Sequence, residues 1–297
     1  MNLTLHRAGD TVLQGIPGVV SLVKKLSFAL LAFFFLATPH EGMAEDGILY
    51  IGSSTISMGI LEQGAANAFT EKTGIPFKDL EHLGSGRGID ALLAGTTELA
   101  GASRPLRKEE KDKDAVGHTI GYDAIAVFVH RSNPVDSLTK DQLEGIFTGR
   151  TTNWRKVGGE DLPITPNTEI PSTKRATYLM FQKIAMDGSP YAEGFSQIDL
   201  PRDQLVHLAG DRTGICTVSL GLLSAVGDEI RSELRVVSID GVTPDEKSIR
   251  SGSYLVSRPL LLVTRGVPRG NTKRFIEFML SGEGQGYVAK NFTPVRR

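Results

Sequence analysis

The sequence predicts an α/β protein with a largely parallel sheet. Short apolar runs alternate with runs in which apolar residues recur every three or four positions, and this alternation is typical of strands connected by helices. The 297 residues are 40% hydrophobic and 23% charged, which is enough apolar material for one large or two medium domains. No internal repeat is present.

The N-terminal stretch is predicted to be a signal peptide over residues 1–44. Lys24 and Lys25 precede the apolar run 26–37, and small residues allow cleavage after Ala44. The apolar run is short for a bilayer span, so an uncleaved membrane anchor is only the alternative. The mature protein is therefore expected in the periplasm.

Charge and cysteine content exclude several classes of function. The formal net charge of −1 argues against a nucleic-acid partner. Cys216, the single cysteine, lies in an apolar segment and is predicted to be a buried, inert thiol without a disulfide. The histidines have no metal-ligand spacing, so neither a metal nor a cofactor is expected.

The first half of the mature chain is predicted to alternate strands and helices. Gly74 ends the first helix, because glycine is the usual residue just beyond a helix. Tyr122–Val129 is almost wholly apolar and predicts a buried strand, whereas the mixed charges of 107–114 predict a solvated helix face. The strands are expected over 48–52, 77–82, 98–102 and 122–129, and further helices near 58–72 and 88–95.

The second half contains recognisable helix starts. Residues 139–142 form a capping box, which predicts a helix that ends at Gly149. Ser172 or Thr173 is predicted to begin another helix, and 243–246 a third with Pro244 at its first position. Trp154 is predicted to be a packing anchor, with stacking on a ligand as the alternative. A strand over 259–264 and a helix after Asn271 close the chain.

Small hydroxyl residues recur where one element ends and the next begins. Residues 52–57 (GSSTIS) join the first strand to the first helix, and 83–89, 101–106 and 171–175 repeat the theme with Gly or Arg nearby. A helix start exposes unpaired N–H groups and the positive end of the helix dipole, so hydroxyls there can complete a site for a small anion. One such residue is usually only a cap, but four boundaries predict an anion site.

Eight short motifs then follow one another along the chain: GSST, GSGRGI, GASRPL, GYDAIAVFV, LEGIFTGRTTNW, TGICTVSLG, SRPLLLVTRGVP and SGEGQGYV. In this order they resemble the phosphate-binding proteins of bacterial phosphate ABC transporters, from about residue 47 to 297. The resemblance implies an α/β periplasmic-binding-protein fold, type II-like, with two lobes joined by two crossover strands. Lobe 1 would comprise 46–127 plus 257–297, and lobe 2 would comprise 128–256.

The resemblance also implies which residues hold the oxyanion. Thr55 and Ile56 match a hydroxyl and a backbone N–H, and Arg104 replaces an acid found in many relatives. We expect Arg104 to supply the main positive charge through a bidentate contact, with Arg87 as the alternative. The expected ligand-binding residues are Ser54, Thr55, Ile56, Ser85, Arg87, Ser103, Arg104, Asp123, Ser172 and Thr173.

Asp123 is the expected determinant of anion selectivity. At neutral pH phosphate carries a proton and sulfate does not, so a buried carboxylate attracts the first and repels the second. Because Arg104 occupies the position of the relatives' acid, Asp123 is the expected replacement. The alternative is that Asp123 only pairs with an arginine or a backbone N–H.

The predicted function is periplasmic binding of inorganic phosphate and delivery to the permease of an ABC transporter, by a monomer without enzyme activity. A secreted phosphatase-like enzyme and a phosphate sensor or adhesin are the alternatives. A serine nucleophile would need an activating base, and metal-assisted hydrolysis would need clustered ligands; neither is recognisable. Arsenate, sulfate and phosphorylated metabolites remain open as ligands.

Overall fold

One mixed sheet organises residues 47–296, the part of the chain that the computed structural model describes. Its main path is β2-β1-β3-β10-β4-β8-β6-β7, while β11 and β9 also pair with β4, and β5 pairs with β9. The predicted signal peptide lies outside the described residues. The strands are β1 (Ile48–Gly52), β2 (Phe77–Glu81), β3 (Leu99–Ala102), β4 (Ala115–His130), β5 (Ser137–Leu138), β6 (Thr165–Thr168), β7 (Ser196–Gln197), β8 (Gly214–Ser219), β9 (Leu234–Ile239), β10 (Ser257–Arg265) and β11 (Thr293–Pro294).

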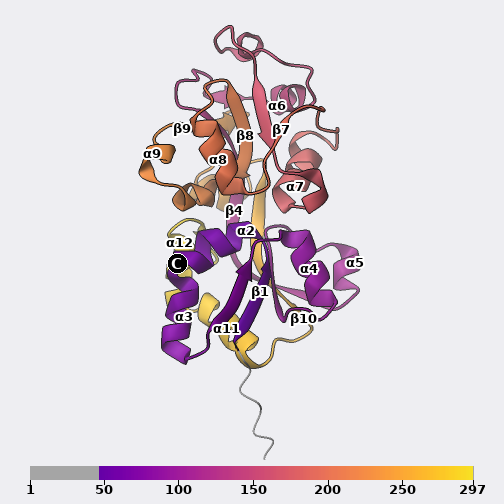
Figure 1. The fold of residues 1–297 in the computed structure, drawn as a ribbon, viewed down its shortest axis with the longest axis vertical. Helices are drawn as coiled ribbons and strands as arrows, with labels where there is room; N and C mark the ends of the chain where they lie inside the picture. Colours follow the sequence, from indigo (N-terminus) through magenta and orange to yellow (C-terminus); the bar gives the residue numbers. More distant parts are fainter. Residues whose placement is uncertain (1–46, 297) are drawn as a thin grey trace, which may run out of the picture. The chain divides into compact units, whose positions relative to one another are not determined.

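Helices connect most of these strands, as Figure 1 shows. The α-helices are α2 (Ser54–Ile56), α3 (Ala66–Thr73), α4 (Ser85–Leu93), α5 (Lys108–Lys111), α6 (Lys140–Phe147), α7 (Ala176–Ala185), α8 (Pro201–Ala209), α9 (Asp228–Arg231), α10 (Glu246–Ser251), α11 (Gly270–Leu280) and α12 (Gly282–Ala289). A π-helix, η1 (Ser57–Ala65), and the 3-10 helices η2 (Trp154–Val157), η3 (Pro171–Thr173) and η4 (Leu220–Ala225) complete the set. Among the described residues, none of the helices has the length and apolar character to cross a bilayer.

The long strand β4 belongs to both halves of the sheet. Its residues up to Ala124 pair antiparallel with β10, and its residues from Ile125 onward pair antiparallel with β8. The Ile125 N–H also bonds the Val256 carbonyl (2.9 Å), just before β10 begins. Two neighbouring segments therefore connect the two lobes, whereas β1, β2 and β3 pair parallel on one side and β6, β7 and β8 on the other. The exact lobe boundaries stay a prediction.

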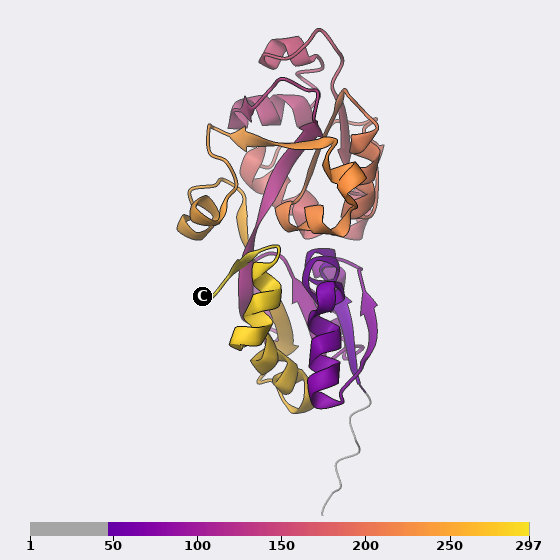
Figure 2. The same ribbon diagram turned by 90° about the vertical axis from the view of Figure 1, so that its left-hand side faces the viewer.

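The part of the sheet formed by β1, β2, β3 and β10 has a helix layer on each face. Along β10 the side chains alternate: Leu260 and Leu262 pack toward α3, α11 and α12, and Leu261 and Val263 pack toward α4. Figure 2 shows the first of these layers facing the viewer. A strand that is apolar on both faces reads as a continuous apolar run, which explains the sequence of β10.

The other half repeats this arrangement with its own core. On β4, Val127 and Val129 pack with α6 and α7, while Ala126 and Phe128 pack with α8 and η4. Trp154 is 1% exposed in the first of these clusters and donates its Nε1–H to the Thr213 carbonyl (2.8 Å), so its predicted role as a packing anchor is confirmed. Cys216 is fully buried, which raises the pKa of its thiol.

Several predicted boundaries are wrong, and local geometry explains why. The first helix starts at Ser54 and kinks at Gly64, which has φ 112°, before Gly74 ends it as predicted. The helix predicted from Ser172 or Thr173 begins at Ala176, because Lys174 (φ 52°) turns the chain first. In α10 the capping residue is Asp245, so Pro244 lies before the helix.

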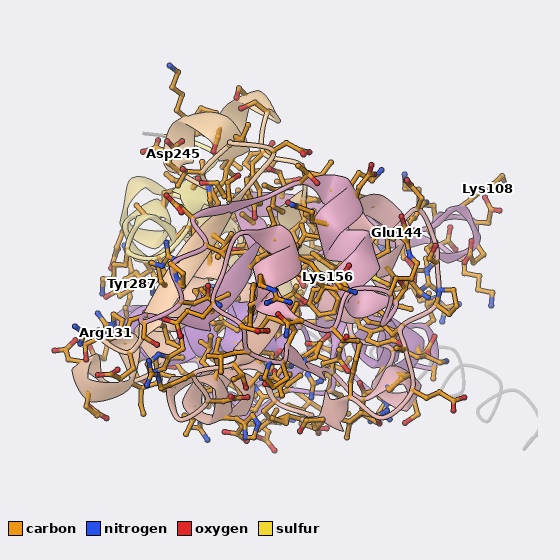
Figure 3. All side chains as sticks on the ribbon, turned by 90° about the horizontal axis from the view of Figure 1, so that it is seen from above. Lys108, Arg131, Glu144, Lys156, Asp245 and Tyr287 are labelled. Atoms are coloured by element: carbon orange, nitrogen blue, oxygen red, sulfur yellow. The ribbon has the colours of Figure 1, made fainter. Side chains whose placement is uncertain are left out.

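The solvated helix predicted over 107–114 is only partly confirmed. Figure 3 shows Lys108 of α5 at the rim of the molecule, and its side chain is 85% exposed. Glu110 of the same helix is instead buried against Arg104. By contrast, the capping box at Thr139 forms as predicted.

Candidate functional site

A small cavity lies where three helical segments begin. In the first turn of a helix the N–H groups have no carbonyl partner, and the dipole places partial positive charge there. Convergence of α2, α4 and α7 therefore makes this cavity a place for an anion. Its lining residues are Ser53, Ser54, Thr55, Gly84, Ser85, Ser103, Glu169, Arg175, Ala176 and Thr177.

Two glycines of the motif GSGRG bring α4 to the cavity. Gly84 caps α4 with φ 89°, a conformation that other residues rarely adopt. Gly88 lies so close to β1 that a Cβ atom there would be 2.4 Å from the Ile51 carbonyl oxygen. The glycines thus allow the helix to approach the strand and to present Ser85 beside Ser54 and Thr55.

The hydroxyl groups in the cavity are arranged as donors. Three of them already accept a hydrogen bond: Ser54 from Arg175 Nη1 (3.3 Å), Ser85 from the Ser103 N–H (3.0 Å) and Ser103 from the Ser53 hydroxyl (3.0 Å). A hydroxyl has one hydrogen to donate, and here that hydrogen remains available for a ligand. Such a cavity favours a ligand made of acceptor oxygens.

Arg175 is the cation that lines the cavity. Its side chain is 5% exposed, and its Nε and Nη2 atoms each donate to Asp199 at 3.1 Å. Nη1 donates to Ser54 and to the His82 carbonyl (3.0 Å), so the guanidinium joins the segment before α7 to α2 and to the loop after β2. The bidentate pairing fixes the plane of the guanidinium against the cavity wall.

Glu169 is the acid that lines the cavity. It is 4% exposed, and one carboxylate oxygen accepts the Tyr178 N–H (2.9 Å) at the start of α7. Burial raises the pKa of Glu169 to about 7, against the opposing effect of Arg175. Near neutral pH this side chain can therefore either donate a proton to a bound oxyanion or accept one from it.

The raised pKa predicts that the ligand-free protein loses stability between about pH 4.5 and 7. In this window the folded state holds a proton on Glu169 that the unfolded state, with its ordinary pKa, has released. The free energy of unfolding therefore falls as pH rises, by about 3 kcal/mol across the window. Urea denaturation at several pH values should show this fall, and Glu169→Gln should flatten it. Equal slopes in the two proteins would contradict the raised pKa.

The structure brings together only part of the set expected from sequence. Ser54, Thr55, Ser85 and Ser103 line the cavity. The Ile56 N–H instead donates to the Ser53 carbonyl (3.1 Å) within the helix start.

Neither expected arginine lies in the cavity. Arg104 is 4% exposed and pairs with both oxygens of Glu110 (2.6 and 2.8 Å), which commits its guanidinium to the protein. Arg87 is exposed and donates to the Ser172 carbonyl (3.4 Å) outside the cavity.

The expected hydroxyls of lobe 2 also lie elsewhere. Ser172 is exposed, and the Thr173 hydroxyl donates to the Ile170 carbonyl (2.6 Å). The turn at Lys174 places the following residues, Arg175 to Thr177, against the cavity instead.

Asp123 forms an ion pair with an arginine, the kind of contact that was the alternative for it. It is 1% exposed and pairs with Arg258, whose Nε and Nη2 atoms lie 2.9 and 2.8 Å from Oδ2. Burial raises the pKa of Asp123, while Arg258 opposes that shift. Asp123 is outside the cavity lining.

Sequence reasoning missed Glu169, Arg175 and Thr177. Arg175 ends the motif at 171–175, but the ligand contacts were assigned to the hydroxyls of that motif, Ser172 and Thr173. Glu169 directly follows Asn167 and Thr168 at the end of β6. The available signal was that an acid, Glu169, and an arginine, Arg175, lie on either side of the Ser172-Thr173 turn.

No cluster of His, Cys, Asp and Glu within residues 47–296 is arranged to hold a metal ion. The donors around the cavity are N–H and O–H groups, which hydrogen-bond an anion. The arrangement can therefore bind and enclose a small oxyanion.

Comparison with known proteins agrees with this chemistry. The PBP superfamily domain matches residues 37–283. The chain is 31% identical to the phosphate-binding protein PstS of Staphylococcus saprophyticus, over 69% of each chain, and 29% identical to that of Bacillus subtilis, over 84% of this chain and 82% of the relative. A putative phosphate ABC transporter substrate-binding protein from Clostridium perfringens, solved with bound phosphate, superimposes with a TM-score of 0.75 at 31% identity, over 84% of this chain and all of that one.

Proposed function

The chain belongs to the PBP superfamily and, within it, to the phosphate-binding proteins of ABC transporters, and on that premise we propose that its cavity binds inorganic phosphate for uptake. The proposal rests on one observation: the cavity at three helix starts is lined by hydrogen-bond donors and has Arg175 as its cation. This family consists of substrate-binding proteins and not of enzymes.

Calorimetry on protein stripped of ligand by unfolding and refolding tests the proposal. Phosphate, arsenate, sulfate and a phosphate monoester are titrated in turn. We expect phosphate to bind with favourable enthalpy at one site. The ester should bind more weakly, because it brings an additional group into the same small cavity. Failure of phosphate to bind would overturn the proposed function.

One group of side chains resembles the catalytic residues of a serine enzyme. Ser57 Oγ lies 2.6 Å from His82 Nδ1, and His82 Nε2 lies 3.0 Å from Glu62, an order of groups that can activate a serine. The Ser57 side chain is fully buried, however, and also contacts the Ser53 carbonyl (3.2 Å). No substrate can reach it, so the arrangement is structural.

Binding should close the two lobes. Residues of 46–127 plus 257–297 and of 128–256, which we propose as lobes 1 and 2, supply donors to one cavity, so an anion that touches both stabilises the closed state. Small-angle scattering should therefore give a smaller radius of gyration with phosphate than without it. An unchanged radius in protein that binds phosphate tightly would contradict a site shared by two lobes.

Delivery to a permease and action as a monomer in the periplasm complete the proposal. The exposed large apolar residues of the described chain are scattered over β4, α8 and two loops: Leu83, Val116, Tyr122, Val206 and Val267. Such scattered residues give no sign of a subunit interface. Light scattering checks the monomer, and permease genes beside this one would support the transport role.

A further inference from the structure

The two crossover strands share a buried ion pair. Arg258 of β10 lies opposite Asp123 of β4 in the strand register, and their side chains are 0% and 1% exposed. A buried pair loses much of its attraction to desolvation, and two apolar residues can hold strands together as well or better. Stability of the strands alone therefore gives no reason for this pair.

The same guanidinium also reaches the back of the cavity. Its Nη2 donates to Thr55 Oγ1 and its Nη1 donates to Thr177 Oγ1, both at 3.1 Å. Thr55 stands at the start of α2 and Thr177 at the start of α7, so the threonines come from opposite sides of the cavity that both line. Arg258 is not among the lining residues and lies behind the two hydroxyls.

This geometry decides how the threonines meet a ligand. A guanidinium has only donors, so each threonine oxygen must accept from Arg258 and direct its own hydrogen elsewhere. Because both threonines line the cavity, that hydrogen is available to a ligand there. Without Arg258, each hydroxyl could turn an oxygen lone pair toward the anion, which repels it.

We propose that Arg258, held by Asp123, is a positioning residue that fixes Thr55 and Thr177 as hydrogen-bond donors to the anion and so links closure of the lobes to binding. The inference rests on the proposed function. Arg258 acts through the threonines and not as the ligand's counter-charge, because it is not among the residues that line the cavity.

The test exchanges the pair together, as Asp123→Asn with Arg258→Met, so that no unpaired buried charge remains and the net charge is unchanged. We expect this variant to bind phosphate about 30-fold more weakly, mainly through faster dissociation, as measured by calorimetry and stopped flow. The same exchange is then made in a Thr55→Val/Thr177→Val background. There it should change Kd less than about threefold, because the groups that Arg258 positions are gone.

Arg235→Met is the matched control for loss of a packed arginine. Arg235 donates to the Asn133 and Val135 carbonyls, and is outside the cavity lining. It should lower stability without changing the phosphate Kd.

Two results would overturn the inference. One is wild-type phosphate affinity in the pair variant, and the other is an equal loss of affinity with and without the threonines, which would indicate a general structural role.

If the pair variant does not fold, Arg258→Lys takes its place in the cycle. Its single nitrogen keeps the charge pair but cannot hold both hydroxyls, so about a tenfold loss is expected, again only where the threonines are present. Failure of the wild-type protein to bind phosphate would instead reject the proposed function.

Discussion

Arg175→Ala should nearly abolish phosphate binding. Arg175 is the cation that lines the cavity, is almost fully desolvated, and is held in place by Asp199. Removing a buried charged donor from an anion site costs about 4 kcal/mol, or roughly a thousandfold in Kd. Calorimetry on the folded variant measures the loss.

The adjacent Lys174→Gln is the matched control. Lys174 also connects the segment before α7 to α4, through Asp90 at 3.5 Å, but its side chain is 61% exposed and lies outside the lining. It should bind phosphate within about threefold of wild type, since exposed ion pairs contribute little. If Arg175→Ala bound normally and Arg104→Ala did not, the sequence-based expectation for Arg104 would stand instead.

Glu169→Gln should remove the distinction between phosphate and sulfate. At pH 8 the carboxylate, with a pKa of about 7, is mostly ionised. The ionised carboxylate can accept a hydrogen bond from the O–H group of phosphate. Sulfate has no such hydrogen, so its oxygens meet only the lone pairs of the carboxylate. Glutamine offers an N–H to either anion. We therefore expect sulfate affinity at pH 8 to rise about 100-fold, since a like-charge contact costs several kcal/mol, and phosphate affinity to fall.

The pH dependence provides an internal control. Below pH 7 the protonated Glu169 can donate a hydrogen bond to sulfate. In the wild-type protein the ratio of phosphate affinity to sulfate affinity should therefore be smaller at pH 6 than at pH 8. In Glu169→Gln competition titrations should give the same ratio at both pH values. If sulfate bound to the Asp123→Asn variant and not to the Glu169→Gln variant, Asp123 would be the residue that determines selectivity, as expected from the sequence.

The local sequence determined most of the elements and half of the site's chemistry. The capping box at Thr139, the stop at Gly74 and the apolar run in β4 depend on neighbouring residues alone, and each formed as predicted. Ser54, Thr55 and Ser85 were recognisable for the same reason, because hydroxyls at helix starts have a local signature. Ser103 was recognisable as a hydroxyl directly after a strand.

Only the tertiary structure decided which charges serve the cavity. Arg104 and Arg175 both follow a hydroxyl motif, yet Arg104 is taken by Glu110 six residues further along, while Arg175 is turned inward by the left-handed Lys174. Likewise, Asp123 meets Arg258 across the crossover strands, and Glu169 becomes the acid in the cavity. A charged side chain settles where a partner offsets its desolvation, and the partner of Asp123 lies 135 residues away in the sequence. Local patterns therefore fix backbone and hydroxyls, and long-range pairing assigns the charges.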